Sequence, residues 1–235
     1  MIIEGAIAVK AAVLNGKRDI VKVYIDKDKK TKDFNFIRKS VRNKGILLLE
    51  WERSQIESLA SGKSHGGILA EVSERKDDVF SNGDIFYLDG IEDPFNLGYS
   101  MRTLYALGVE NLLLSPWERS SMEGQLLKSS AGAYDMLKVK TAKDPYTEIK
   151  SFKEMGYHIY GLYRGQDSKD IFDTVFAEKA LFLLGGEKRG ISAQLLELCD
   201  ETLYISYGSD FRNALNASGA LDVTVTLLRN QRRRK

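Results

Sequence analysis

The sequence predicts an α/β protein with a mostly parallel sheet. Segments with strand patterns alternate with segments with helix patterns along nearly the whole chain, and the later strands are continuous apolar runs, which is typical of strands covered on both faces. With 235 residues, 43% of them hydrophobic and 29% charged, the chain has a globular composition and the length of one large domain or two small ones. A polar stretch at 73–84 contains the turn-forming pair Asn82-Gly83, and we expect a domain boundary there.

Residues 1–75 predict a small α/β domain, close to the lower size limit for a self-sufficient core. Apolar residues at helical spacing indicate helices, and short apolar runs indicate strands. The expected elements are a helix over Ile2–Leu14, a strand over Val21–Ile25, a helix over Asp33–Asn43, a buried strand over Gly45–Leu49, a short helix over Gln55–Ala60 and a strand over Gly67–Val72.

Residues 84–235 predict a second α/β domain with stronger strands. Ligands of parallel sheets bind beyond the carboxyl ends of the strands, so the loops after Leu88, Leu184 and Ile205 form the candidate site. The expected elements are strands over Asp84–Asp89, Asn111–Ser115, Met136–Val139, His158–Leu162, Ala180–Gly185 and Thr202–Ser206, with helices over Asn96–Leu107, Gly124–Ser130, Tyr146–Met155, Ser192–Cys199 and Ala214–Asn230.

The composition excludes several classes of protein. Cys199 is the only cysteine, so no intramolecular disulfide and no cysteine zinc cage can form, and with only His65 and His158 as histidines we expect no metal. No apolar run approaches the ~20 residues of a membrane span, and the chain start lacks the basic residues of a signal peptide. We therefore expect a cytoplasmic protein without membrane contact.

The charge is distributed unevenly between the two halves. Residues 1–80 hold 16 Lys and Arg against 12 Asp and Glu, and the remainder holds 19 against 21. Basic residues near the start and in the final run 232–235 fit an electrostatic surface for nucleic acid. The charge alone leaves this interpretation open but favours the alternative, a solvated surface and a frayed tail.

Each candidate loop allows a structural and a functional interpretation. Asn96 and Arg102 are a helix cap and a surface charge, or two active-site groups; their spacing does not require one helix face. The glycines of 185–190 form a tight turn, or they let the backbone approach a ligand; the segment is neither a Walker loop nor a dinucleotide-binding motif. Asn216 near the last helix has the same two interpretations.

Together the three loops resemble the three motifs of the SpoU/TrmH family of RNA ribose methyltransferases, within the SPOUT superfamily. The resemblance covers roughly 84–231, and residues 1–75 look like the small ribosomal-protein-like RNA-binding domain often fused in front. The matching segments are Asp93–Gly98 with Arg102, Leu184–Glu187 continuing through Gly190–Ser192, Ile205 followed by Leu215–Ser218, and the intervening Lys128–Ala133.

This resemblance implies a C-terminal trefoil knot that binds S-adenosylmethionine, a homodimer that completes the active site, and rRNA or tRNA as substrate. The cofactor-binding positions would be Leu184, Gly185, Gly186, Ile205 and Leu215. The polar active-site positions would be Asn96, Arg102, Glu187 and Asn216. Because a guanidinium has a pKa above ~12, we expect Arg102 to hold a phosphate and stabilise the developing alkoxide more readily than to act as a free base.

The third motif departs from the family pattern. Ser206-Tyr207 stands where Pro-Met is usual, Ala214 stands where Ser is usual, and the stretch from Ile205 to Leu215 is about one residue longer. These changes concern cofactor affinity and the details of catalysis more than the fold. Ala214 favours one alternative to a ribose methyltransferase, a catalytically weakened RNA-binding homologue of the same fold. An RNA base methyltransferase is a second alternative, against which Asn96 and Arg102 match the ribose branch of the family.

Overall fold

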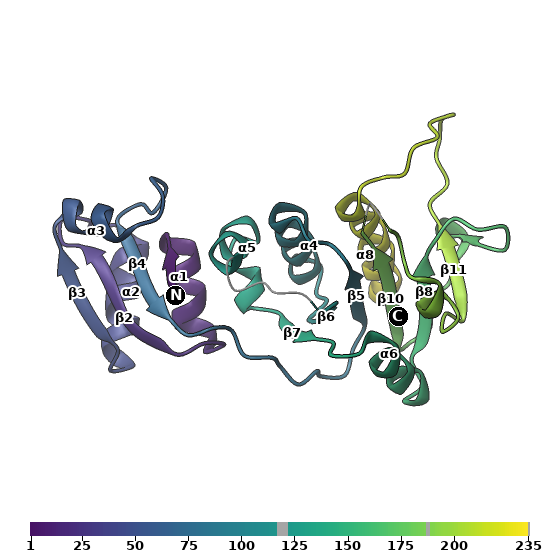
Figure 1. The fold of residues 1–235 in the computed structure, drawn as a ribbon, viewed down its shortest axis with the longest axis horizontal. Helices are drawn as coiled ribbons and strands as arrows, with labels where there is room; N and C mark the ends of the chain where they lie inside the picture. Colours follow the sequence, from purple (N-terminus) through teal and green to yellow (C-terminus); the bar gives the residue numbers. More distant parts are fainter. Residues whose placement is uncertain (117–121, 187–188, 235) are drawn as a thin grey trace. The chain divides into compact units, whose positions relative to one another are not determined.

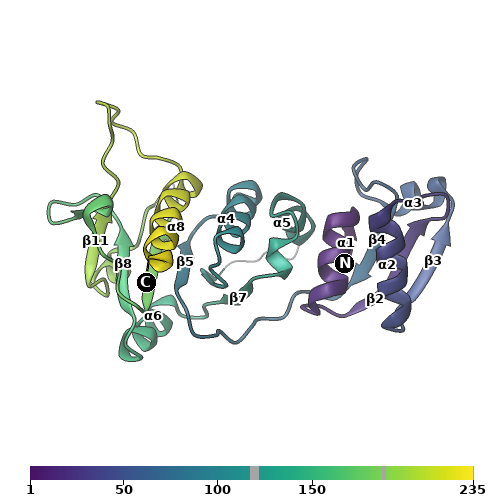
Figure 2. The same cartoon turned by 180° about the vertical axis from the view of Figure 1, so that it is seen from behind.

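The computed structural model describes residues 1–116, 122–186 and 189–234 (Figures 1 and 2). Its contacts divide the chain into two compact units, Met1–Lys76 with Arg119–Met136, and Asp77–Glu118 with Leu137–Lys235. The segment 119–136 is therefore grouped with the N-terminal residues although it lies in the second half of the expected division. The domain division at 73–84 stays a prediction.

The N-terminal unit is built on a four-stranded sheet with the order β1-β4-β2-β3. β2 and β3 are parallel, and β4 runs antiparallel to β1 and β2. The elements of this unit are β1 (Ile2–Glu4), α1 (Ala6–Asn15), β2 (Ile20–Asp26), α2 (Lys32–Asn43), β3 (Leu47–Trp51), α3 (Arg53–Leu59), β4 (Ile68–Val72), α5 (Glu123–Ser129) and a 3-10 helix over Ala133–Asp135.

Two expectations for this unit are wrong. The helix expected over Ile2–Leu14 begins only at Ala6, because Gly5 has φ of +93° and separates it from β1, which pairs with the edge of β4. The strand expected to be buried over 45–49 is β3, an edge strand in which Leu47 is 56% exposed. The other four elements are found within about two residues of their expected bounds, the usual uncertainty at element ends.

A buried network of charges ties α5 and the 3-10 helix to the start of β2. The Arg18 guanidinium donates two hydrogen bonds to the Asp135 carboxylate, at 3.0 and 2.9 Å, and a third to Glu123 at 2.6 Å. The side chains of Arg18 and Asp135 are fully buried. Burial lowers the pKa of Arg18, but Asp135 and Glu123 outweigh burial and raise it, so the guanidinium stays charged.

The C-terminal unit is built on seven strands, all parallel, in the order β7-β6-β5-β10-β8-β11-β9. This confirms the parallel sheet expected from the sequence. The elements are β5 (Ile85–Asp89), α4 (Pro94–Ala106), β6 (Asn111–Leu114), β7 (Lys138–Thr141), α6 (Pro145–Glu154), β8 (His158–Leu162), β9 (Lys169–Asp170), a 3-10 helix over Ile171–Asp173, β10 (Ala180–Gly185), α7 (Ala193–Leu196), β11 (Glu201–Tyr204) and α8 (Ala217–Arg233).

Helices cover both faces of this sheet. Alternate residues of β5 and β10 pack with Ile149 of α6 and Leu195 of α7 in one apolar cluster. α4 and α8 pack against each other, and α8 also contacts β10. The end of α8 is fixed by Arg232, which donates hydrogen bonds of 3.0 and 2.7 Å to the carboxylate of Asp84, the residue before β5. Among the described helices, none is long and apolar enough to cross a membrane.

The starts of two helices differ from the sequence expectation. α4 begins at Pro94 and is capped by Asp93, whose carboxylate accepts hydrogen bonds from the backbone of Phe95 and Asn96, so the expectation that Asn96 is the cap is wrong. Proline at the first helical position, where no N–H is needed, decides this start. α8 begins three residues later than expected, with the Asn216 side chain accepting from Gly219 N at 2.8 Å.

Candidate active site

An apolar pocket of about 290 Å³ lies beyond the carboxyl ends of β10 and β11. Leucine, isoleucine and alanine side chains, tyrosine rings and glycine backbone form most of its wall. The structure brings all five predicted cofactor-binding residues to this one pocket, although they come from segments up to 31 positions apart in the chain: Leu184, Gly185, Gly186, Ile205 and Leu215.

The wall of this pocket requires glycine where the chain leaves β10. A Cβ on Gly185 would lie 2.0 Å from the carbonyl carbon of Gly190, and a Cβ on Gly186 would lie 2.5 Å from the carbonyl oxygen of Gly90. Gly190 N donates to Gly186 O at 2.9 Å, so the chain returns on itself after β10. No side chain larger than hydrogen fits these two positions without moving backbone, and the glycines therefore shape the pocket.

The loop from β11 to α8 forms the other side of the apolar pocket. The Tyr207 hydroxyl accepts a hydrogen bond from Leu215 N at 3.0 Å, which closes this loop across eight residues. The Arg164 guanidinium lies 5.9 Å from the ring centroid of Tyr204 and 5.7 Å from that of Tyr207. Arg212 also lines the pocket. Two of the residues that depart from the family pattern, Tyr207 and Ala214, thus form part of the wall.

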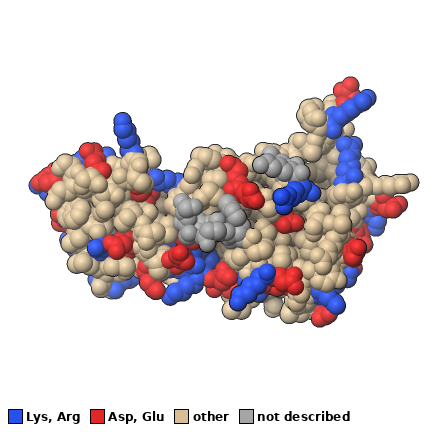
Figure 3. All heavy atoms as spheres, in the orientation of Figure 1, with Lys and Arg blue, Asp and Glu red and all other residues tan. Residues whose placement is uncertain are grey.

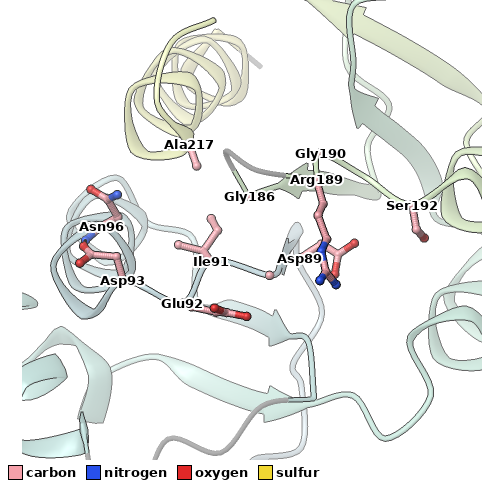
Figure 4. Close-up of a pocket in the computed structure, with 11 residues that line it drawn as sticks. Asp89, Ile91, Glu92, Asp93, Asn96, Gly186, Arg189, Gly190, Ser192 and Ala217 are labelled. Atoms are coloured by element: carbon pink, nitrogen blue, oxygen red, sulfur yellow. The ribbon is translucent and has the colours of Figure 1, made fainter.

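An acidic pocket of about 470 Å³ adjoins the apolar pocket, and the two share Gly186, Gly190 and Ala217 (Figure 4). Its charged and polar lining comes from the end of β5, the first turn of α4 and the loop after β10. Figure 4 shows the Arg189 side chain directed toward Asp89. The charged and polar lining residues are Asp89, Glu92, Asp93, Asn96, Arg189 and Ser192.

A buried tyrosine, Tyr87, hydrogen-bonds to one of the carboxylates that line the acidic pocket. The Tyr87 hydroxyl donates to the Asp89 carboxylate at 3.1 Å. Burial raises the pKa of Tyr87 far above its usual range, and the negative charge of Asp89 raises it further. Tyr87 therefore remains a neutral hydrogen-bond donor that orients Asp89.

The predicted catalytic residues do not all meet in one place. Asn96 lines the acidic pocket. Arg102 and Asn216 are exposed and line neither pocket; Asn216 is occupied in capping α8. Glu187 lies outside the described residues. Arg102 lies on the outer face of α4, since it is six positions after Asn96 and the helix therefore directs it away from the pocket.

Arg102 shares that outer face with two exposed aromatic side chains. Phe95 and Tyr99 precede it by seven and three residues, which is helical spacing for one face. They are 49% and 51% exposed, and their ring centroids are 6.5 Å apart. An exposed aromatic pair beside an arginine is unusual for a solvent face and typical of an interface.

The structure adds site residues that the sequence argument missed. Asp89 ends β5, and Glu92 and Asp93 lie in the segment that follows, so all three belong to the loop after Leu88 that the strand-end rule selected, but they were not singled out as site residues. Arg164 and Arg212 carry no local pattern, and only the folding of their loops against each other brings them together. Within residues 1–116, 122–186 and 189–234, no group of three or more His, Cys, Asp or Glu is placed to hold a metal ion.

The fold is that of an α/β protein with two adjoining pockets at the carboxyl ends of parallel strands. Residues 84–226 match the family model described as SpoU rRNA Methylase family, and residues 2–77 match that described as RNA 2'-O ribose methyltransferase substrate binding. The chain therefore belongs to the SpoU rRNA methylase family and is an RNA methyltransferase, which confirms the resemblance found in the sequence.

Relatives match over almost the full length of both chains. The 23S rRNA (guanosine-2'-O-)-methyltransferase RlmB of Xylella fastidiosa is 26% identical over 234 residues, which is 95% of this chain and 93% of that protein. A putative TrmH family tRNA/rRNA methyltransferase of Staphylococcus saprophyticus is 28% identical over 233 residues, covering 94% of this chain and 91% of that protein.

Solved structures share the fold. The SpoU methyltransferase AviRb from Streptomyces viridochromogenes, in complex with the cofactor AdoMet, superposes with a TM-score of 0.80 at 21% identity over 99% of this chain and 90% of that chain. A putative RNA methyltransferase of the TrmH family from Porphyromonas gingivalis superposes with a TM-score of 0.79 at 20% identity, over 100% of this chain and 90% of that chain. These confirm the expected fold class; the knot itself stays a prediction.

Proposed function

We propose that this enzyme transfers the methyl group of S-adenosylmethionine to a ribose 2′-hydroxyl of rRNA or tRNA, with the cofactor in the apolar pocket and the acceptor ribose in the acidic pocket. One observation carries the proposal. The residues of the second and third motifs meet at one pocket, and that pocket shares a wall with another that contains Asn96 of the first motif.

The lining of the apolar pocket fits such a cofactor. A purine needs flat apolar walls and backbone groups at its edge, and both are present around Gly185, Ile205 and Leu215. The volume, about 290 Å³, is at the lower end of the ~300–1,000 Å³ usual for ligand pockets. When bound, S-adenosylmethionine supplies a methyl group on a positively charged sulfur. The carboxylates of Asp89 and Glu92 favour a cation near the shared wall.

The polar residues act by orientation and charge. Asn96 offers both an amide donor and an amide oxygen to a hydroxyl in the acidic pocket. Arg102 holds a phosphate next to the acceptor ribose and stabilises the negative charge that develops on its oxygen. Transfer in line requires mainly that the hydroxyl be held opposite the methyl group, which is a contribution of positioning.

Arg102 requires a second subunit for this role. Because it lies on the outer face of α4, away from the pocket of its own chain, we propose that a homodimer brings it to the acidic pocket of the partner. The exposed pair Phe95 and Tyr99 supplies apolar area for that contact. A face used by both subunits of a two-fold dimer places one Arg102 at each of the two sites.

The N-terminal unit supports RNA binding through a limited set of lysines. Positive and negative side chains are interspersed over the face seen in Figure 3, so binding depends on local charge. Lys10, Lys22, Lys27 and Lys76 are each paired with a carboxylate. In contrast, the side-chain amines of Lys30, Lys32 and Lys63 have no partner among the described residues.

These three lysines lie at one end of the N-terminal sheet, whereas Lys39, which also has no partner among the described residues, lies within α2. Lys30 is in the segment after β2, Lys32 is the first residue of α2, and Lys63 precedes the start of the antiparallel β4, so these segments leave the same end of the sheet. Lys29 Nζ donates to Gly66 O at 3.1 Å and joins the segments after β2 and before β4. We propose that this end of the sheet contacts RNA phosphates. The names of the RlmB relatives favour rRNA as the substrate.

Complementation between two inactive variants tests the shared site. Arg102→Ala and Asn96→Ala should each abolish methylation and leave binding of S-adenosylhomocysteine, measured by calorimetry, unchanged. After the two proteins are mixed and allowed to exchange subunits, half of the dimers are mixed and each has one intact site, so roughly a quarter of wild-type activity should return. No recovery in verified mixed dimers would refute the shared site. Failure of the wild type to bind S-adenosylhomocysteine would refute the cofactor assignment.

A further inference from the structure

The apolar pocket contains two cations and no anion among its described lining residues, namely Arg164 and Arg212. They reach the pocket from different loops, Arg164 after β8 and Arg212 between β11 and α8. Arg164 is held in place by the rings of Tyr204 and Tyr207. The Arg212 guanidinium has no hydrogen-bond or ion-pair partner in the described part of the chain, although it lines a largely apolar cavity.

The acidic pocket has the opposite charge. Its lining includes the carboxylates of Asp89, Glu92 and Asp93 and a single guanidinium, that of Arg189. The shared wall of glycine and alanine therefore separates a positive region from a negative one. A ligand that occupies both pockets is favoured if its cationic centre lies toward the acidic pocket and its anionic group lies beside the two arginines of the apolar pocket.

We propose that Arg212 binds the α-carboxylate of the cofactor's methionine moiety, and that Arg164 provides a second positive charge beside it. The inference rests on the proposed function and adds the residue that recognises the amino-acid end of the cofactor. The cofactor carries a cationic sulfur, an uncharged purine, and an amino-acid end with an α-ammonium and an α-carboxylate. The carboxylate is its only anionic group and therefore the one that an arginine can bind.

The type of side chain supports this role. A guanidinium presents a planar set of donors that fits both oxygens of a carboxylate, and it remains charged at any physiological pH. Arg212 belongs to the loop in which the sequence departs from the family pattern, so the resemblance assigns it no function. Because the Arg212 guanidinium has no partner among the described residues, no internal contact must be broken before it binds a carboxylate.

A pair of ligands that differ in the methionine portion tests the proposal. S-Adenosylhomocysteine carries the carboxylate, whereas 5′-methylthioadenosine retains the nucleoside and lacks the amino-acid end. Binding of both is measured by calorimetry for the wild type, Arg212→Ala, Arg212→Lys and the control Arg229→Ala. The control removes the same charge from an exposed position on α8 that lines neither pocket.

We expect Arg212→Ala to weaken the binding of S-adenosylhomocysteine about fivefold to tenfold and to leave the binding of 5′-methylthioadenosine unchanged. This loss lies between the contribution of an exposed ion pair and that of a desolvated charge-assisted hydrogen bond. Arg212→Lys should lose less affinity for S-adenosylhomocysteine than Arg212→Ala, and Arg229→Ala should bind both ligands as the wild type does. Equal weakening of both ligands, or no change in either, overturns the proposal. A loss of RNA affinity without a change in either ligand also overturns it and assigns Arg212 to RNA. If the wild type binds neither ligand, the proposed function itself fails.

Discussion

Removing Arg18 is predicted to destabilise the N-terminal unit more than any surface substitution. In Arg18→Met, the fully buried Asp135 carboxylate loses its two guanidinium hydrogen bonds, and Glu123 loses a third. The remaining contacts are weak: Arg75 Nε is 3.8 Å from Asp135, and the Tyr134 hydroxyl donates to Glu123 at 3.3 Å. Two buried carboxylates are therefore left largely uncompensated.

The expected cost is about 3–5 kcal/mol, the usual range when one partner of a buried ion pair is removed. In a unit of fewer than ~100 residues this lowers the Tm by more than about 10 °C. Because the chain has two units, a single unfolding transition cannot be assumed. Hydrogen exchange followed peptide by peptide in urea reports each unit separately, and protection should fall in β2, α5 and the N-terminal sheet while β5 and β10 keep theirs.

A compensated variant separates the loss of charge balance from a loss of packing. Arg18→Met combined with Asp135→Leu and Glu123→Gln removes the unpaired charges and keeps similar volumes, so it should recover more than half of the lost stability. A cost below about 1 kcal/mol for Arg18→Met, or an equal loss of protection in both units, would show that the network does not hold α5 in the N-terminal unit.

Three further predictions concern the pocket wall, the end of α8 and acid stability. Gly185→Ala places a Cβ 2.0 Å from the backbone of Gly190 and should weaken S-adenosylhomocysteine binding, measured by calorimetry, more than about tenfold. The control Gly208→Ala adds a Cβ that meets nothing within 4 Å and should leave this binding unchanged. Equal effects of the two substitutions would contradict the role of glycine in the pocket wall. Arg232→Met removes the ion pair of the partly buried Asp84, whose carboxylate then keeps only the hydrogen bond from Ala180 N, and should lower the free energy of unfolding in urea by about 1–3 kcal/mol. An unchanged midpoint would contradict this. Burial raises the pKa of Glu4, but its hydrogen bonds lower it more, so the folded value lies below the unfolded one. The stability advantage of the wild type over Glu4→Gln should hold above about pH 5 and shrink toward pH 3, and an advantage that grows on acidification would refute the assignment.

The strands of the second sheet were predictable because strands that are buried on both faces have continuous apolar sequences. β8 and β10 have the bounds expected from the sequence. β9 was not expected, since its two residues pair only at the sheet edge. β7 begins two residues later than expected: its polar edge sequence carries no periodic pattern, and its register is fixed by pairing with β6.

The site was predictable only in part, for a geometrical reason. The cofactor positions lie at the ends of adjacent or near-adjacent strands, so identifying strands and motifs was sufficient to group them. Arg102 and Asn96 lie on one helix, and the sequence shows their spacing but not which face meets the pocket. Arg212 illustrates the opposite case, because its loop has no regular structure and its place at the pocket depends on tertiary folding.

The most direct test of ribose methylation follows a labelled methyl group. The purified protein is incubated with S-adenosylmethionine carrying a deuterated methyl group and with rRNA and tRNA from a strain that lacks its gene, and the digested RNA is analysed by mass spectrometry. If the protein is a ribose methyltransferase, the label will be on the ribose 2′-oxygen of one nucleotide. Label on a base, or no label from a protein that binds S-adenosylhomocysteine, would contradict it.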